Sequence, residues 1–144
     1  MTLISLEEAQ SRVLEPIERL GAEDVSLDQC LGRVLAESLV ATRSQPPADN
    51  SAMDGYAMRW ADLQAIPDMG LGLRVVSDIQ AGGWSDREIG PGEAARIMTG
   101  APVPPGEDLL VIMRERVDES TEGIVRVFQP GDGPGQNIRL AGED

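Results

Sequence analysis

Glycine and proline constrain the fold of this chain more than any other feature of its sequence. The sixteen Gly and ten Pro lie mostly beyond residue 45, and they cut the apolar sequence there into short runs. Runs of about 5–8 residues bounded by such turn-forming residues are typical of strands. The sequence therefore predicts a β-rich region from residue 46 onward. The four clearest strand candidates are residues 71–79, 94–98, 108–113 and 123–128.

A helix signal marks the beginning of the chain. Ser5 and Glu8 have the spacing of a capping box, in which each side chain bonds the backbone amide of the other residue. Pro16 would disrupt a helix interior, so we expect this helix to end near Leu14. The apolar residues that would share one face of it are Leu6, Ala9, Val13 and Leu14.

Two further elements are expected before residue 45. Residues 23–27 alternate between polar and apolar, which indicates a short strand. Asp28 is a candidate N-cap for a second short helix that would run to Leu35. Cys30 falls in this apolar helical context, so we expect a buried structural thiol rather than a nucleophile. The expected fold class is mainly β with a small helical N-terminal portion.

The charged residues narrow the chemistry that is available. The chain has no Lys and no His, and all twelve basic residues are Arg. This composition excludes P-loop lysines, Schiff-base chemistry and imidazole bases or metal ligands. The oxygen donors that remain favour Mg²⁺ over zinc or copper. The net charge of -13 argues against nucleic acid and anionic membranes as partners.

The sequence carries no signal for export or membrane insertion. Its N-terminus lacks the basic segment of a secretory signal. No apolar run approaches the roughly 18–20 residues that span a bilayer. The single cysteine rules out an internal disulfide and suits a reducing compartment. We therefore expect a cytoplasmic location.

The most oxygen-rich loop is residues 46–57, which lacks the periodicity of a helix or a strand. Such loops build tight turns or hold hard cations and anionic substrates, and composition alone favours the turn. Asp49 stands two residues before Ser51, which favours an Asx-turn in which its carboxylate accepts the Ser51 amide hydrogen. Asp54 precedes Gly55, which allows a ligand or another backbone to approach closely.

A second loop follows the predicted strand at 94–98. The hydroxyl of Thr99 and free backbone amides at Thr99 and Gly100 would suit an oxyanion such as phosphate. The alternative for Thr99 is a turn hydroxyl that bonds its own backbone. Arg96 has the planar fork of an anion clamp, but its alternation from Thr99 is equally compatible with a side chain that faces solvent.

Three segments, in the same order, resemble one known family. They are PPADNSAMDGYA at 46–57, RIMTGAPVP at 96–104, and GQNIR at 135–139 followed by GED at 142–144. With LGRVLA at 31–36 they closely resemble the MoeA family of molybdenum-inserting enzymes, which shares these motifs with the E domain of gephyrin. The resemblance implies that residues 46–135 form a domain of coiled, bifurcated β-sheets. It also implies that residues 1–45 form a dimerisation portion, to which residues 136–144 return.

The resemblance further implies an enzyme of molybdenum cofactor synthesis. Such an enzyme is a homodimer that inserts molybdate into adenylylated molybdopterin, with Mg²⁺, and releases AMP. The active-site residues of the family motifs match Asp54, Thr99 and Asp144. The implied substrate-binding residues are Asn50, Ser51, Arg96 and Gly100, and the implied metal ligands are Asp54 and Asp49.

In the family the chain continues into a molybdopterin-binding domain and a small β-barrel domain. Residues 1–144 therefore resemble an N-terminal fragment that holds half an active site, and we expect it to be inactive alone.

Two other classes of function stay open. A gephyrin-like relative uses the same architecture as a non-catalytic, dimerising scaffold. A stand-alone anion-binding protein would require tight binding of molybdate by this chain itself.

Overall fold

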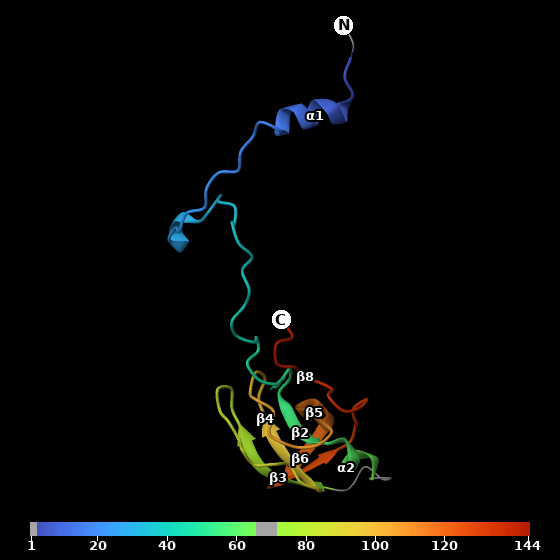
Figure 1. Ribbon diagram of the computed structural model, residues 1–144. Coiled ribbons are helices and arrows are strands. Elements are labelled where there is room, and N and C mark those ends of the chain that lie inside the picture. The colour runs from blue at the N-terminus through green and yellow to red at the C-terminus, as the bar shows by residue number, and fades with distance from the viewer. Residues whose placement is uncertain (1–2, 66–71) are drawn as a thin grey trace. The chain divides into compact units, whose positions relative to one another are not determined.

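Figure 1 shows the computed structural model, which describes residues 3–65 and 72–144. The chain divides into two compact units, Met1–Val40 and Ala41–Asp144. Among the residues described, no helix is long and apolar enough to cross a bilayer.

The first unit contains the predicted helix, α1 (Leu6–Leu14). The Ser5 side chain accepts a hydrogen bond from the Glu8 backbone amide at 3.2 Å, as expected for an N-cap. The helix ends two residues before Pro16. The Ser5 cap and the end of this helix are therefore confirmed, but the Glu8 side chain accepts from Arg12 at 2.7 Å, and within residues 3–65 no bond from the Ser5 amide to it completes the capping box.

Residues 15–40, all of which are described, are less regular than the sequence predicts. The predicted strand at 23–27 is absent from this stretch, and the predicted helix from Asp28 is a single 3₁₀ turn, η1 (Leu27–Gln29). Gly32 adopts a left-handed φ of 81°, which ends the helical path soon after η1. Cys30 is exposed, so the prediction of a buried thiol was wrong. The neighbouring Leu31 is 96% exposed, because this part of the chain has no core of its own.

The second unit is built around a six-stranded sheet. Its strands are β2 (Gly55–Arg59), β3 (Gly72–Ile79), β4 (Glu93–Ile97), β5 (Leu109–Met113), β6 (Val117–Thr121) and β7 (Ile124–Val127). They lie in the order β5-β2-β4-β3-β7-β6. Strands β3 and β4 pair in parallel, and the other neighbours are antiparallel. The sheet curls on itself in Figure 1. The predicted mainly β fold class is confirmed.

Shorter elements complete this unit. Helix α2 (Trp60–Gln64) directly follows β2, and the 3₁₀ turn η2 (Arg114–Arg116) directly follows β5. A separate antiparallel pair joins β1 (Asn50–Ser51) to β8 (Ile138–Arg139), which lie far apart in the sequence. This pair ties the returning C-terminal segment to the oxygen-rich loop.

Four of the six strands in the sheet follow the sequence prediction, and two do not. Strands β3, β4, β5 and β7 lie within the predicted runs, apart from Glu93 at the start of β4, and residue 71 of the first run falls outside the described residues. Strand β2 was missed because it is buried on both faces and so shows no alternation. Strand β6 was missed because it is a largely exposed edge strand of charged and hydroxyl residues.

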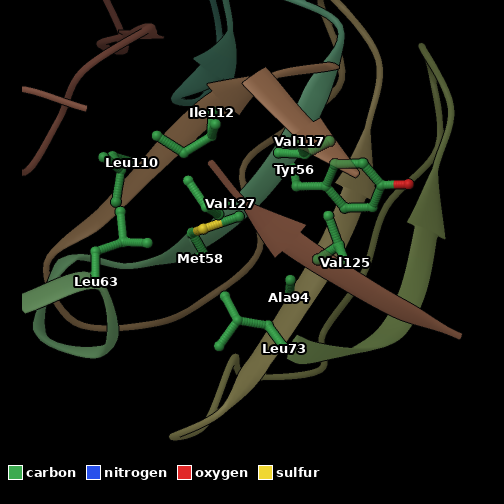
Figure 2. Close-up of a cluster of buried hydrophobic side chains, with 10 residues drawn as sticks. All are labelled: Tyr56, Met58, Leu63, Leu73, Ala94, Leu110, Ile112, Val117, Val125 and Val127. Carbon is green, nitrogen blue, oxygen red and sulfur yellow. The ribbon is translucent and has the colours of Figure 1, made fainter. Parts of the chain in front are cut away.

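The sheet separates two clusters of buried side chains. Successive residues of β2 alternate between them, with Tyr56 and Met58 in the first cluster and Ala57 in the second. Figure 2 shows the first cluster, in which the Tyr56 hydroxyl points away from the other labelled side chains. Both faces of β2 are therefore fixed by packing, which holds the loop at its beginning in place.

Candidate functional site

The structure brings Asp54 and Thr99 together, although 45 residues separate them in the sequence. Asp54 directly precedes β2 and Thr99 follows β4. These strands are antiparallel with Gly55 opposite Ile97, so the first residue of β2 and the last residue of β4 lie side by side at the same end of the sheet. The backbone amide and the hydroxyl of Thr99 both donate to Oδ1 of Asp54, each at 2.7 Å. We call this arrangement the Asp54–Thr99 corner.

The charge of Asp54 is stabilised by its surroundings. The hydrogen bonds from the hydroxyl and amide of Thr99 lower the pKa of Asp54, and the positive charges of Arg114 and Arg96 lower it further. Asp54 is therefore ionised at neutral pH. Because both hydrogen bonds end on Oδ1, its other carboxylate oxygen is left to accept from a ligand or a water.

The loop after β4 does not offer the free amides that the sequence predicted. The Thr99 amide donates to Asp54, the Gly100 amide to the Ser51 carbonyl at 2.8 Å, and the Ala101 amide to the Met98 carbonyl at 2.9 Å. The alternative of a Thr99 hydroxyl that bonds its own backbone is also wrong, since it donates to Asp54. An oxyanion at this corner must therefore take its hydrogen bonds from side chains rather than from these amides.

Ser51, rather than Asp49, closes the turn in the oxygen-rich loop. The Ser51 hydroxyl donates to the Met53 carbonyl at 2.6 Å and accepts from the Met53 amide at 3.3 Å. Ser51 is 1% exposed, so its hydroxyl is turned into the protein in this arrangement. Its neighbour Asn50 has a buried Oδ1 without a hydrogen-bond partner among the described residues. Both polar groups are therefore buried, and the roles predicted for Asn50 and Ser51 in substrate binding stay predictions.

Asp49 has a structural role that the sequence did not indicate. The predicted Asx-turn is wrong, because the Ser51 amide donates to the Ala101 carbonyl instead. The Asp49 carboxylate accepts from the Ala141 amide at 2.8 Å, and the Asp49 carbonyl accepts from the Val103 amide at 2.9 Å. Asp49 thus joins the oxygen-rich loop, the loop after β4 and the returning segment.

Asp144 lies in the returning segment that passes along residues 45–51. Its amide donates to the Gln45 carbonyl at 3.0 Å, and its carboxylate forms an ion pair with Arg139. Gly142 donates in the same way to the Pro46 carbonyl. The roles predicted for Asp144 and Asp49 in catalysis and metal binding stay predictions, as does the assignment of residues 136–144 to the first domain.

Arg96 lies opposite Tyr56 on the neighbouring strand, beside a groove of about 630 Å³. Its guanidinium makes a long ion pair with Asp78 at 3.4 Å and is partly exposed. The groove is lined by residues of β2, β3, β4, β6 and β7. Its polar lining residues include Tyr56, Arg96 and Glu119, and of these three only Arg96 is among the groups that lower the pKa of Asp54.

Arg114 lies near the corner and was missed by sequence reasoning, as was its partner Glu119. Arg114 donates through Nε and Nη2 to the two carboxylate oxygens of Glu119, at 2.9 and 3.1 Å. The Arg114 backbone amide also donates to the Asp54 carbonyl at 3.1 Å. A basic residue directly after a buried strand was the available signal, but the pairing of β5 with β2 was needed to place it.

The described residues do not form a complete site for Mg²⁺. No three His, Cys, Asp or Glu side chains gather as a possible metal cluster within residues 3–65 and 72–144. One oxygen of Asp54 is already bound by Thr99, and Asp49 bonds Ala141. Asp54 therefore offers a single carboxylate ligand, whereas Mg²⁺ demands near-octahedral coordination. We assign no chemical step to the ion.

Comparison with known proteins identifies relatives along the whole chain. A curated molybdopterin molybdenumtransferase of Haemophilus influenzae is 38% identical over 143 residues, which cover 99% of this chain and 34% of the relative. One of Staphylococcus aureus is 36% identical and covers 98% and 33%. This chain thus spans about a third of the length of the curated relatives that it matches.

Solved structures and a family model agree with these relatives. The molybdopterin biosynthesis moeA protein of Pyrococcus horikoshii OT3 superimposes with a TM-score of 0.82 at 35% identity, covering 99% of this chain and 38% of that one. Residues 4–144 match the family model described as the MoeA N-terminal region (domain I and II). The match covers nearly the whole sequence and includes both residues of the Asp54–Thr99 corner, so this chain belongs to the MoeA N-terminal region family.

Proposed function

We propose that this chain acts in molybdenum cofactor synthesis, as part of an enzyme that inserts molybdate into adenylylated molybdopterin and releases AMP. The names of the curated relatives support this class of reaction. The observation that carries the proposal is the Asp54–Thr99 corner, where two motif residues meet through two hydrogen bonds of 2.7 Å. Convergence of distant polar residues on one accessible carboxylate is typical of a reaction site.

The two residues have different tasks in this proposal. Asp54 is the ionised acceptor, and its free oxygen orients a water or a proton-bearing group of the substrate. Thr99 fixes the direction of that carboxylate, because its amide and hydroxyl hold the same oxygen. The Thr99 hydroxyl keeps lone pairs with which it contacts substrate as an acceptor.

Several further expectations belong to the same proposal. The curated relatives are about three times as long as the part that aligns with this chain, and we propose that residues 1–144 alone do not turn over substrate. We also propose that the functional form is a cytoplasmic homodimer. A non-catalytic scaffold has no separate observation in its favour, since the curated relatives of Haemophilus influenzae and Staphylococcus aureus carry an enzyme's name.

The test is AMP release from adenylylated molybdopterin and molybdate by the full-length polypeptide that contains residues 1–144. Asp54→Ala removes the acceptor, and we expect a loss of about 100-fold, the lower end of what a positioned acid or base contributes. Thr99→Ala keeps its backbone amide bond to Asp54, so we expect a smaller loss of about tenfold. Residues 1–144 by themselves should release no AMP.

The matched control is Asp86→Ala, which also removes an exposed carboxylate bound to a single side chain, Trp84. It should retain the wild-type rate. Thermal melts followed by circular dichroism would show that all three variants keep their fold. Wild-type rates in both Asp54→Ala and Thr99→Ala would contradict the proposal, because the corner would then be only a structural turn.

A further inference from the structure

In the described part of the chain, two positive charges lie near the Asp54–Thr99 corner without forming ion pairs with the Asp54 carboxylate. Arg96 and Arg114 both lie near enough to favour the ionised form of Asp54. Neither guanidinium forms an ion pair with Asp54 among the described residues, because Thr99 supplies its donors instead. Arg96 is bound to Asp78 and Arg114 to Glu119. Both arginines therefore act on the carboxylate without bonding to it, and their remaining donors are open to a ligand.

Arg114 is held far more firmly than Arg96. Two hydrogen bonds of 2.9 and 3.1 Å fix the plane of its guanidinium against Glu119, whereas Arg96 has one contact of 3.4 Å. The bonds to Glu119 use one edge of the Arg114 fork, which has five N–H donors in all. The side chain is 56% exposed, so the donors on its other edges are accessible. Arg114 is thus a preorganised cation with unused donors.

The three backbone amides that follow Met98 cannot supply these donors. The amides of Thr99, Gly100 and Ala101, which would otherwise suit an oxyanion, are all bonded within the protein. The guanidinium groups of Arg114 and Arg96 are charged donors near Asp54 that its carboxylate does not use. A dianion placed next to an ionised carboxylate also needs compensating positive charge at short range, particularly in a chain of net charge -13.

We propose that Arg114, held in place by Glu119, is a further substrate-contacting residue that binds a tetrahedral oxyanion beside the Asp54–Thr99 corner. The ligand chemistry is an XO₄ dianion or a phosphate group, and its two possible sources are molybdate and the phosphates of a nucleotide-linked substrate. Arg96, from the neighbouring strand β4, is the second donor. This inference rests on the proposed function, because that function supplies substrates of both kinds.

The geometry favours an oxyanion over a cation. The described residues show no cluster of three acidic groups, and the carboxylates at this place are already bound, Asp54 by Thr99 and Glu119 by Arg114. The planar fork of arginine matches two oxygens of a tetrahedral anion. The groove beside Arg96 and Tyr56 then leaves room for the remainder of a larger substrate.

Direct binding to the ¹⁵N-labelled chain tests this proposal without requiring turnover. Sodium molybdate and inorganic pyrophosphate would be titrated separately at constant ionic strength, set with chloride. The backbone amide of Thr99 and the side-chain Nε–H of Arg114 report on the site. We expect saturable shifts of both signals. The anion that binds more tightly would identify the source, molybdate or nucleotide phosphate.

The decisive comparison uses two arginines that carry the same charge. Arg114→Gln should weaken binding at least tenfold, and Arg114→Lys, which keeps the charge without the fork, should weaken it less. The control Arg74→Gln loses the same charge beside Glu93, at the opposite end of β4 from Thr99. It should bind with nearly wild-type affinity.

Two results would overturn the inference. One is equal affinity in Arg114→Gln and Arg74→Gln, which would mean that net charge alone governs binding. The other is the absence of a saturable shift in the wild-type chain with either anion. Both results leave the AMP-release test of Asp54 and Thr99 unaffected, so failure of this inference is distinct from failure of the proposed function.

Discussion

Substitution of Gly55 by alanine should force apart the two strands that hold Asp54 in place. A Cβ at position 55 would lie 2.0 Å from the Ile112 carbonyl oxygen and 2.8 Å from the carbonyl carbon. Contacts under 3.0 Å are essentially never seen for real Cβ atoms, and a backbone carbonyl cannot rotate away as a side chain would. Strands β2 and β5 would therefore have to separate by about 1 Å at the pair Gly55–Met113.

The expected cost follows from two opposing effects. Overpacking costs about 1–3 kcal/mol, and the upper end applies because the obstructing atoms belong to the backbone. Alanine also restricts the unfolded chain, which returns about 0.4–1 kcal/mol of stability. The net loss is about 2 kcal/mol, which corresponds to a fall in Tm of about 8–16 °C for a unit of this size.

Urea unfolding followed by fluorescence would measure this loss, since Trp60 packs partly buried against the first core cluster. The control is Gly133→Ala, where a new Cβ meets nothing within 4 Å and φ is not left-handed. That variant should stay within about 0.5 kcal/mol of wild type. Equal stabilities of the two variants would refute the argument that Gly55 is required by the close approach of β5. In Gly55→Ala the Thr99 amide signal should also shift, because Asp54 moves with β2.

Two further predictions concern the hydrogen bonds of the site. Thr99→Val removes the hydroxyl that contributes most to lowering the pKa of Asp54, so this pKa should rise toward its ordinary value in a ¹³C-detected carboxylate titration. The stability that a lowered pKa provides is present above the unfolded-state pKa and is lost as pH falls through the folded-state pKa. The free energies of unfolding of wild type and variant should therefore differ at neutral pH and converge in acid. An unchanged pKa of Asp54 in the variant would contradict the role assigned to the Thr99 hydroxyl. Asp49→Ala removes the acceptor of the Ala141 amide, whose hydrogen exchange should accelerate roughly tenfold while that of Thr99 is unchanged. Asp49→Asn keeps an acceptor oxygen and should retain most of the protection; equal exchange rates in Asp49→Ala and wild type would show that this bond does not hold the returning segment.

Local sequence was sufficient wherever the interacting residues are neighbours. The Ser5 cap and the end of α1 depend on contacts within one helical turn, and both could be predicted. The runs that became β3, β4, β5 and β7 could be predicted because glycine and proline delimit them. Local features made Asp54 and Thr99 candidates, beside the alternative of structural turns, and the resemblance of the motifs decided between the two readings.

Sequence reasoning failed where a local pattern competed with a distant partner. The Asx-turn expected at Asp49 is a contact between neighbours, but the Ser51 amide bonds Ala101 and the Asp49 carboxylate bonds Ala141, which is 92 residues away. Pairing of the oxygen-rich loop with these distant segments satisfies the same groups, and the turn moves to Ser51. Strand β2 was missed for a related reason, because burial on both faces removes the alternation on which strand prediction depends.

The sequence by itself determined the β-rich character of the second unit, the helix at the start and the family. Only the tertiary structure decided which side chains meet. The order β5-β2-β4 places Arg114, Asp54 and Thr99 at the same end of three neighbouring strands, although they come from three separate segments. Strand order depends on packing and backbone pairing over the whole unit rather than on the preferences of any one segment, so Arg114 could not be placed beside Asp54 until the sheet was known.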